Sequence, residues 1–169
     1  MRKVLAAVER VLTYLAVIAT LLMMLLTTAD ATARYVFNRP ITGAYEITAE
    51  YIVVAAVFLA ASYAYRRGAY IRVTFVVERV SPRLRTGFNY FSQVYSLVAS
   101  AIMVWATAAQ ALRTFASGTT SSGILAFPLG PAYALVPLGL AVMALAMLLD
   151  LPKVATGESA LLHDDTTPL

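Results

Sequence analysis

The chain has 169 residues, of which 60% are hydrophobic and only 13% are charged. Its mean hydropathy is +0.75, and a soluble domain could not bury so much apolar surface, so the composition predicts an integral membrane protein. The lack of cysteine excludes disulfides, thiolate catalysis and iron–sulfur clusters. Haem between two imidazoles is also excluded, because the one histidine, His163, lies outside the apolar segments. We therefore expect no cofactor.

The net charge of +4 is explained by topology. Of the 13 basic residues, Arg34, Arg39 and Arg113 fall on one side of the apolar segments and the other ten fall on the opposite side. The positive-inside rule places the richer side, with both termini, in the cytoplasm. Since the basic residues do not form one soluble face, no nucleic-acid partner is expected.

The apolar runs predict an all-α membrane protein, a bundle of four transmembrane helices. About 20 residues at about 1.5 Å each cross a hydrocarbon layer of about 30 Å. The first run could be a secretory signal, but at roughly 19 residues it exceeds the usual apolar region of about 7 to 15, so we expect it to remain as an anchor. The predicted helices cover about 5–33, 43–65, 82–115 and 131–150.

Charged residues gather where the first helix meets the second. Asp30 and Arg34 can form an ion pair one turn apart, and Asn38-Arg39-Pro40 predicts a turn because proline disfavours helix before it. Glu46 and Glu50 lie one turn apart on the second helix and would repel each other unless a cation were near. Arg34 and Arg39 are the candidates.

Two interpretations of Glu50 follow. In an aqueous cavity it could bind protons or cationic substrates, as in a small antiporter. If Arg34, Arg39, helix N-terminal amides or a partner subunit satisfy it, the cluster is a structural clamp. We favour the clamp, because the other helices offer few polar groups at mid-depth.

Small residues on the second helix, Ala56, Ala60 and Ala64, recur every four positions and allow another helix to approach closely. That helix could belong to this chain or to a different polypeptide. Residues of about 70–80 place valines on one stripe and charges outside it, which predicts an interfacial amphipathic helix contacting membrane lipid. The segment 153–169 is polar and expected to be disordered. No nucleophile with a base, metal cluster or phosphate loop is present in the sequence, so we do not expect an enzyme.

Two motifs point to a family. They are Arg34-Tyr35-Val36-Phe37-Asn38-Arg39-Pro40 followed by Gly43, Tyr45, Glu46 and Glu50, and Arg67-Gly68-Ala69-Tyr70-Ile71-Arg72-Val73. With these motifs the chain resembles the small, DctQ-like membrane subunit of tripartite ATP-independent periplasmic (TRAP) transporters. It departs from that pattern at Tyr70 and Thr74, where family members often carry His and Asp, so no histidine-dependent role is expected at that turn.

The resemblance implies a subunit of the bacterial inner membrane that scaffolds a large multi-span permease subunit. The complex would take up an organic acid, delivered by a periplasmic substrate-binding protein, by ion-gradient-driven symport. A stand-alone proton-coupled exporter using Glu46 and Glu50 is the alternative, and an anchor for a redox enzyme is a third reading. The predicted functional residues are an interface clamp (Arg34, Tyr35, Phe37, Asn38, Arg39, Pro40, Glu46, Glu50), a packing strip (Ala56, Ala60, Ala64) and a cytoplasmic turn (Arg67, Gly68, Tyr70, Arg72).

Overall fold

The computed structural model describes residues 2–69, 82–123 and 125–154. Within these residues the regular structure is helical apart from one isolated bridge between Thr120 and Pro128. Four helical segments are long and apolar enough to cross a membrane, which confirms the four predicted spans. They are Lys3–Phe37, Ala44–Arg66, Thr86–Ser117 and Gly130–Val154.

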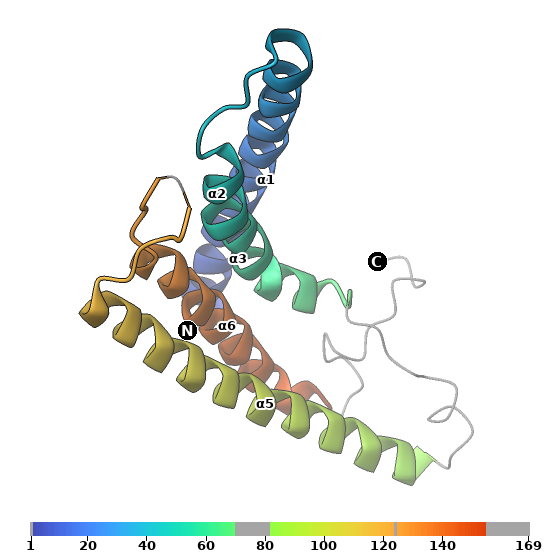
Figure 1. Ribbon diagram of the computed structural model, residues 1–169. Helices are drawn as coiled ribbons and strands as arrows, with labels where there is room; N and C mark the ends of the chain where they lie inside the picture. The colour runs from blue at the N-terminus through green and yellow to red at the C-terminus, as the bar shows by residue number, and fades with distance from the viewer. Residues whose placement is uncertain (1, 70–81, 124, 155–169) are drawn as a thin grey trace.

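The first helix, α1 (Arg2–Phe37), is longer than the sequence predicted. Its 36 residues extend about 54 Å at about 1.5 Å per residue, well beyond the hydrocarbon thickness of about 30 Å. One end of α1 therefore projects past its neighbours (Figure 1). The helix stops at Asn38, whose φ of 51° is left-handed, two residues before Pro40. The helix therefore continues past its predicted end at about 33 and includes Arg34 and Tyr35.

The second span is a composite of three segments. A short helix, α2 (Ala44–Ile47), runs into a π-helical turn, η1 (Thr48–Ile52), and then into α3 (Val53–Arg66). A π-helical turn carries one more residue than an α-helical turn and often occurs at functional sites. Glu50 lies inside it. The regular apolar spacing of the sequence gave no sign of this interruption.

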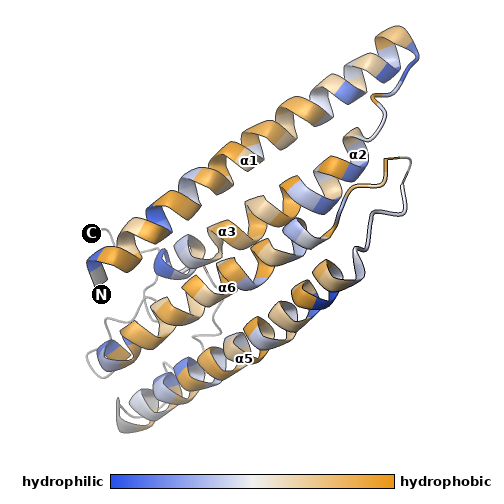
Figure 2. Ribbon diagram, turned by 90° about the vertical axis from the view of Figure 1, so that its left-hand side faces the viewer, coloured by the Kyte–Doolittle hydropathy of each residue, from blue (hydrophilic) through white to orange (hydrophobic). Residues whose placement is uncertain are grey.

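The spans form a row rather than the closed bundle that the sequence suggested. In this row α1 packs against α3, α3 against α6 (Gly130–Asp150), and α6 against α5 (Pro82–Ser117) (Figure 2). The central pair comes close at Gly139, where an added Cβ would collide with the carbonyl oxygen of Phe58. Glycine at this position therefore sets the spacing of α3 and α6.

The interior of the row is mostly apolar, and one of its buried polar groups joins three helices. Gln93 on α5 is fully buried, and its Nε2 donates to the hydroxyl of Tyr65 at 2.9 Å and to the carbonyl of Met147 at 3.0 Å. These bonds join α5 to α3 and α6. On the other side of α3, Ala60 packs against a cluster formed by Leu12 and Ala16 of α1 together with Leu59 of α3.

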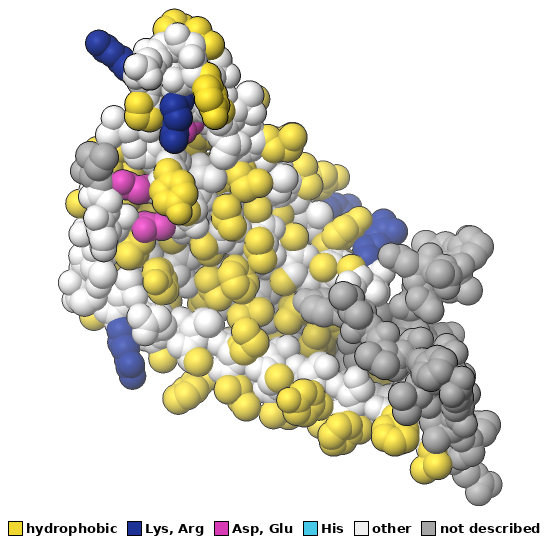
Figure 3. Space-filling model, turned by 45° about the vertical axis from the view of Figure 1, so that its right-hand side comes forward, with side chains coloured by type: hydrophobic (Ala, Val, Ile, Leu, Met, Phe, Trp, Pro, Cys, Tyr) yellow, Lys and Arg dark blue, Asp and Glu magenta, His cyan; other side chains and the backbone are white. Residues whose placement is uncertain are grey.

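Large apolar side chains remain exposed on every span (Figure 3). The exposed fractions include 68% for Leu25, 58% for Val57, 74% for Trp105 and 51% for Leu148. The row therefore presents a surface suited to lipid or to another membrane subunit. Lys153 and Val154, expected in a disordered tail, belong to a 3-10 turn, η2 (Leu151–Val154). The predicted interfacial helix at about 70–80 and the tail from 155 lie outside the described residues.

Candidate functional site

Polar side chains gather at opposite ends of the row. We call them the Glu50 end, where the chain turns from α1 to α2 and from α5 to α6, and the Glu9 end, where α1 begins and α6 finishes. The sequence singled out Glu50 but not Glu9. At both ends the contacts join segments that are far apart in the chain.

At the Glu50 end, both predicted glutamates contact the loop that joins α5 to α6. The hydroxyl of Ser121 donates to Oε1 of Glu50 at 3.0 Å. The backbone N–H of Leu125 donates to Oε2 of Glu46 at 3.3 Å. A Cβ at Gly123 would collide with the Glu46 carboxylate, so this loop needs glycine to lie so close. The structure thus brings the two carboxylates to a loop in which the sequence predicted no functional residue.

The loop is held by its own hydrogen bonds. The N–H of Ser121 donates to the carbonyl of Phe127 at 2.8 Å, and that of Leu129 donates to Thr119 at 3.0 Å. The hydroxyl of Tyr51 donates to the carbonyl of Pro128 and ties the loop to the π-helical turn. Ser121 itself is buried. Its only sequence signal was a polar stretch placed between two apolar spans.

The arginines do not neutralise Glu50 as expected. Arg34 pairs with Asp30 at 2.8 Å, as its spacing predicted. The other carboxylate oxygen of Asp30 accepts the N–H of Ile41 at 2.8 Å, which fixes the turn after α1. Arg39 is exposed. The expected pairing of Glu50 with an arginine is therefore replaced by its bond to Ser121.

One oxygen of Glu50 remains unsatisfied. Its Oε2, like the hydroxyl of Thr48, is buried and has no hydrogen-bond partner among the described residues. Beside Glu50 is a mostly apolar cavity of about 300 Å³ between the π-helical turn, α3 and α6, lined by Ala49, Glu50, Val54, Leu129, Ala132, Tyr133 and Val136. A buried carboxyl oxygen without a donor is costly. A donor brought by another molecule would remove that cost.

Aromatic side chains project around the same end. The exposed fractions are 88% for Tyr35, 71% for Phe37 and 81% for Tyr45. Rigid aromatic side chains left exposed next to charges are typical of contact surfaces and of membrane interfaces. The predicted clamp residues thus share one end of the row, although they do not pair with one another as the sequence suggested.

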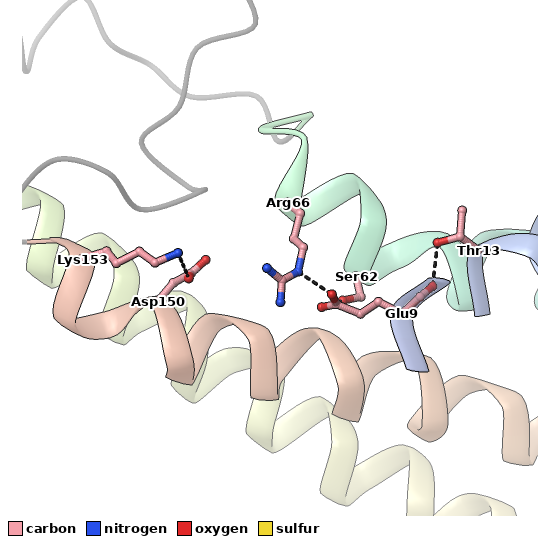
Figure 4. A network of polar contacts seen from close by, with 6 residues as sticks. All are labelled: Glu9, Thr13, Ser62, Arg66, Asp150 and Lys153. Carbon is pink, nitrogen blue, oxygen red and sulfur yellow. Dashed lines mark hydrogen bonds and ion pairs between the residues drawn. The ribbon is translucent and has the colours of Figure 1, made fainter. Parts of the chain in front are cut away.

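At the Glu9 end, a buried ion pair joins α1 to α3 (Figure 4). The exposed fraction of Glu9 is 6%. Its carboxylate accepts the hydroxyl of Ser62 at 2.7 Å and lies 2.5 Å from Nε of Arg66. Asp150 and Lys153 form a second pair at 2.9 Å. The sequence did show the carboxylate of Glu9 inside a predicted span, which signals a buried charge. Residue spacing could not reveal that Arg66 is its partner.

The predicted turn after α3 begins as a regular helix end. Gly68 has a φ of 67° and its N–H donates to the carbonyl of Tyr65 at 3.1 Å, which is the helix-ending role of glycine. The guanidinium of Arg67 lies 5.4 Å from the ring centre of Tyr63. Tyr70 and Arg72 lie outside the described residues.

Most of the chain matches a known protein family. Residues 23–157 match the family model described as tripartite ATP-independent periplasmic transporters, DctQ component. The chain belongs to the DctQ family. The match includes all of the Glu50 end and begins within α1. A search among curated proteins finds no significant match to the chain.

DctQ proteins are components of a transporter and do not form an enzyme family. The described residues contain no group of three or more His, Cys, Asp or Glu side chains that could hold a metal ion. The four apolar spans and the family together make this chain a multi-pass membrane subunit of a TRAP transporter.

Proposed function

We propose that this DctQ protein is the small permease subunit that scaffolds the large membrane subunit of its TRAP transporter. The family match carries the proposal. The complex would use an ion gradient to import an organic acid delivered by a periplasmic binding protein. We place the protein in the bacterial inner membrane, with the Glu9 end toward the cytoplasm, following the distribution of basic residues.

The way polar groups are used supports a scaffold rather than a carrier. The hydroxyls of Thr20 and Thr107 donate to the carbonyls of Ala16 at 2.9 Å and Met103 at 2.7 Å, within their own helices. The side-chain amide of Gln93 forms the hydrogen bonds that join α5 to α3 and α6. A carrier needs polar groups turned toward a substrate path, whereas these serve the packing of the row.

The open row supports the presence of a large partner. Its spans leave Trp105, Leu25 and other large apolar side chains exposed. In lipid, helices associate through packing and hydrogen bonds rather than through the hydrophobic effect. A long apolar face, together with a polar anchoring point, fits association with a larger membrane subunit.

The Glu50 end is the proposed anchoring point. Among the clamp residues predicted from the sequence, Glu50 lines the cavity and has a buried, unsatisfied oxygen. A donor or cation from the large subunit would satisfy this oxygen, with a small movement of the Glu50 side chain. Tyr35 and Phe37, exposed in the last turn of α1, would add apolar contact.

Gentle extraction of an affinity-tagged chain from its native membrane tests the proposal. We expect a large multi-span protein to co-purify in a defined ratio. Recovery of a lone homodimer would contradict the scaffold role. The stand-alone exporter is tested separately by proton-linked efflux from vesicles that contain only this chain, where we expect none.

A further inference from the structure

A second cavity lies at the Glu9 end, away from the proposed subunit contact. It has a volume of about 280 Å³ and is bounded by the start of α1, the end of α3 and the end of α6 with η2. Its lining residues are Lys3, Ala6, Arg66, Leu149, Asp150 and Lys153. Three cationic side chains, each from a different part of the chain, thus converge on one cavity.

Two of these cations offer unused donors. Arg66 contacts Glu9 through Nε, and its two terminal amino groups have no polar partner among the described residues. In Figure 4 these groups lie on the side facing α6, away from Glu9. Lys3 is exposed and likewise has no described polar partner. Lys153 is held near the cavity by Asp150 at 2.9 Å.

The charge of the cavity favours an anion. Three cations face one acid, Asp150, and Glu9 is already engaged by Ser62 and Arg66. Several ammonium and guanidinium groups around a small cavity match the oxygens of a phosphate group. Asp150 pairs with Lys153, so a cationic or neutral ligand would bring no charge to compensate Lys3.

The surroundings favour a phosphate that belongs to a lipid. A neighbouring cavity of about 320 Å³ shares Arg66 and Ala6 with the first and adds two tyrosines, Tyr14 and Tyr63, beside the polar residues Glu9, Arg10 and Thr13. Along the same stretch of α1, the exposed fractions are 68% for Val4 and 57% for Val11. Free phosphate gains nothing from contact with apolar side chains, whereas the acyl chains of a lipid pack against them. Basic pockets between helices at a membrane surface are known binding sites for anionic lipid headgroups.

We propose that the cavity formed by Lys3, Arg66 and Lys153 binds the phosphate of an anionic phospholipid, whose acyl chains lie along the adjoining surface of α1. The headgroup bridges α1, which packs against α3 and α6, and η2, which packs against α5 and α6. The lipid therefore stabilises the Glu9 end of the row. This inference does not depend on the proposed scaffold role.

Native mass spectrometry of the full chain, with any partner that co-purifies, tests the site. After delipidation, the protein is titrated with phosphatidylglycerol and, separately, with zwitterionic phosphatidylcholine. We expect retention of phosphatidylglycerol. The variant Lys3→Gln, which removes a side chain with no described partner, is expected to weaken binding about fivefold, and Lys3→Gln with Lys153→Gln about tenfold or more. Arg113→Gln, at the opposite end of α5, is the matched control and should bind as the original chain does.

Three results would overturn the proposal. One is equal retention of phosphatidylcholine, which would mean that charge is not recognised. Another is unchanged binding in Lys3→Gln, a variant that does not disturb the buried Glu9 pair. The third is displacement of the lipid by millimolar inorganic phosphate with the same lysine dependence, which would assign the cavity to soluble phosphate. If the double variant fails to fold, as judged by circular dichroism in detergent, Lys3→Gln alone decides.

Discussion

The buried ion pair at the Glu9 end predicts a large and unequal response to mutation. Arg66→Met keeps the length and apolar stem of the arginine but removes the charge that faces Glu9. The Glu9 side chain is only 7% exposed, whereas that of Arg66 is 37% exposed. Removing one partner of a buried pair costs about 3 to 5 kcal/mol because the other charge stays uncompensated. Because Arg66 is partly exposed to solvent, we expect the free energy of unfolding to fall by an amount near the lower value, about 3 kcal/mol.

The second half of this prediction is that the loss is not additive. In the double variant Glu9→Gln with Arg66→Met, no buried charge remains, and the glutamine can still accept from Ser62. We therefore expect the double variant to be more stable than Arg66→Met alone. Unfolding in mixed detergent micelles, followed by circular dichroism, is measured for the original chain, the two single variants Glu9→Gln and Arg66→Met, and the double variant. Arg113→Met at the other end of the row serves as a control for loss of an exposed arginine.

The reasoning would be refuted if Arg66→Met unfolded with the free energy of the original chain. It would also be refuted if the effects of the two single substitutions simply added in the double variant. Either result would mean that the carboxylate of Glu9 does not depend on Arg66 for its stability inside the membrane.

Further predictions concern packing and assembly. Gly139→Leu should separate α3 from α6, because the leucine side chain would meet the backbone of Phe58. Cysteines engineered at facing positions of the two helices should then no longer form a disulfide cross-link, and an intact cross-link would contradict the prediction. Gln93→Leu should destabilise the fold by about 1 kcal/mol through loss of its buried hydrogen bonds, and unchanged unfolding would count against that network. Glu46→Ala and Arg34→Ala should lower recovery of the large subunit more than they lower the stability of this chain; full recovery with reduced uptake would instead favour a direct role in transport.

Much of the site could be predicted only as a set of residue types. The sequence placed Glu46 and Glu50 on one helix near two arginines, and the pairing of Asp30 with Arg34 followed from their spacing. It did not reveal that Ser121, 71 residues from Glu50, would supply the hydrogen bond. Nor did spacing disclose the π-helical turn, because a single extra residue per turn leaves the apolar pattern almost unchanged.

The sequence by itself determined the number of spans and their approximate positions. Transfer of a helix into lipid depends on a local window of about 20 residues, and prolines such as Pro40 and Pro82 act on their immediate neighbours. Only the tertiary structure decided that the spans form a row and that Glu9 meets Arg66. Helices of similar hydropathy are equivalent to the lipid, so their order and rotation depend on a few distant contacts, such as the approach of Gly139 to Phe58 and the bonds of Gln93.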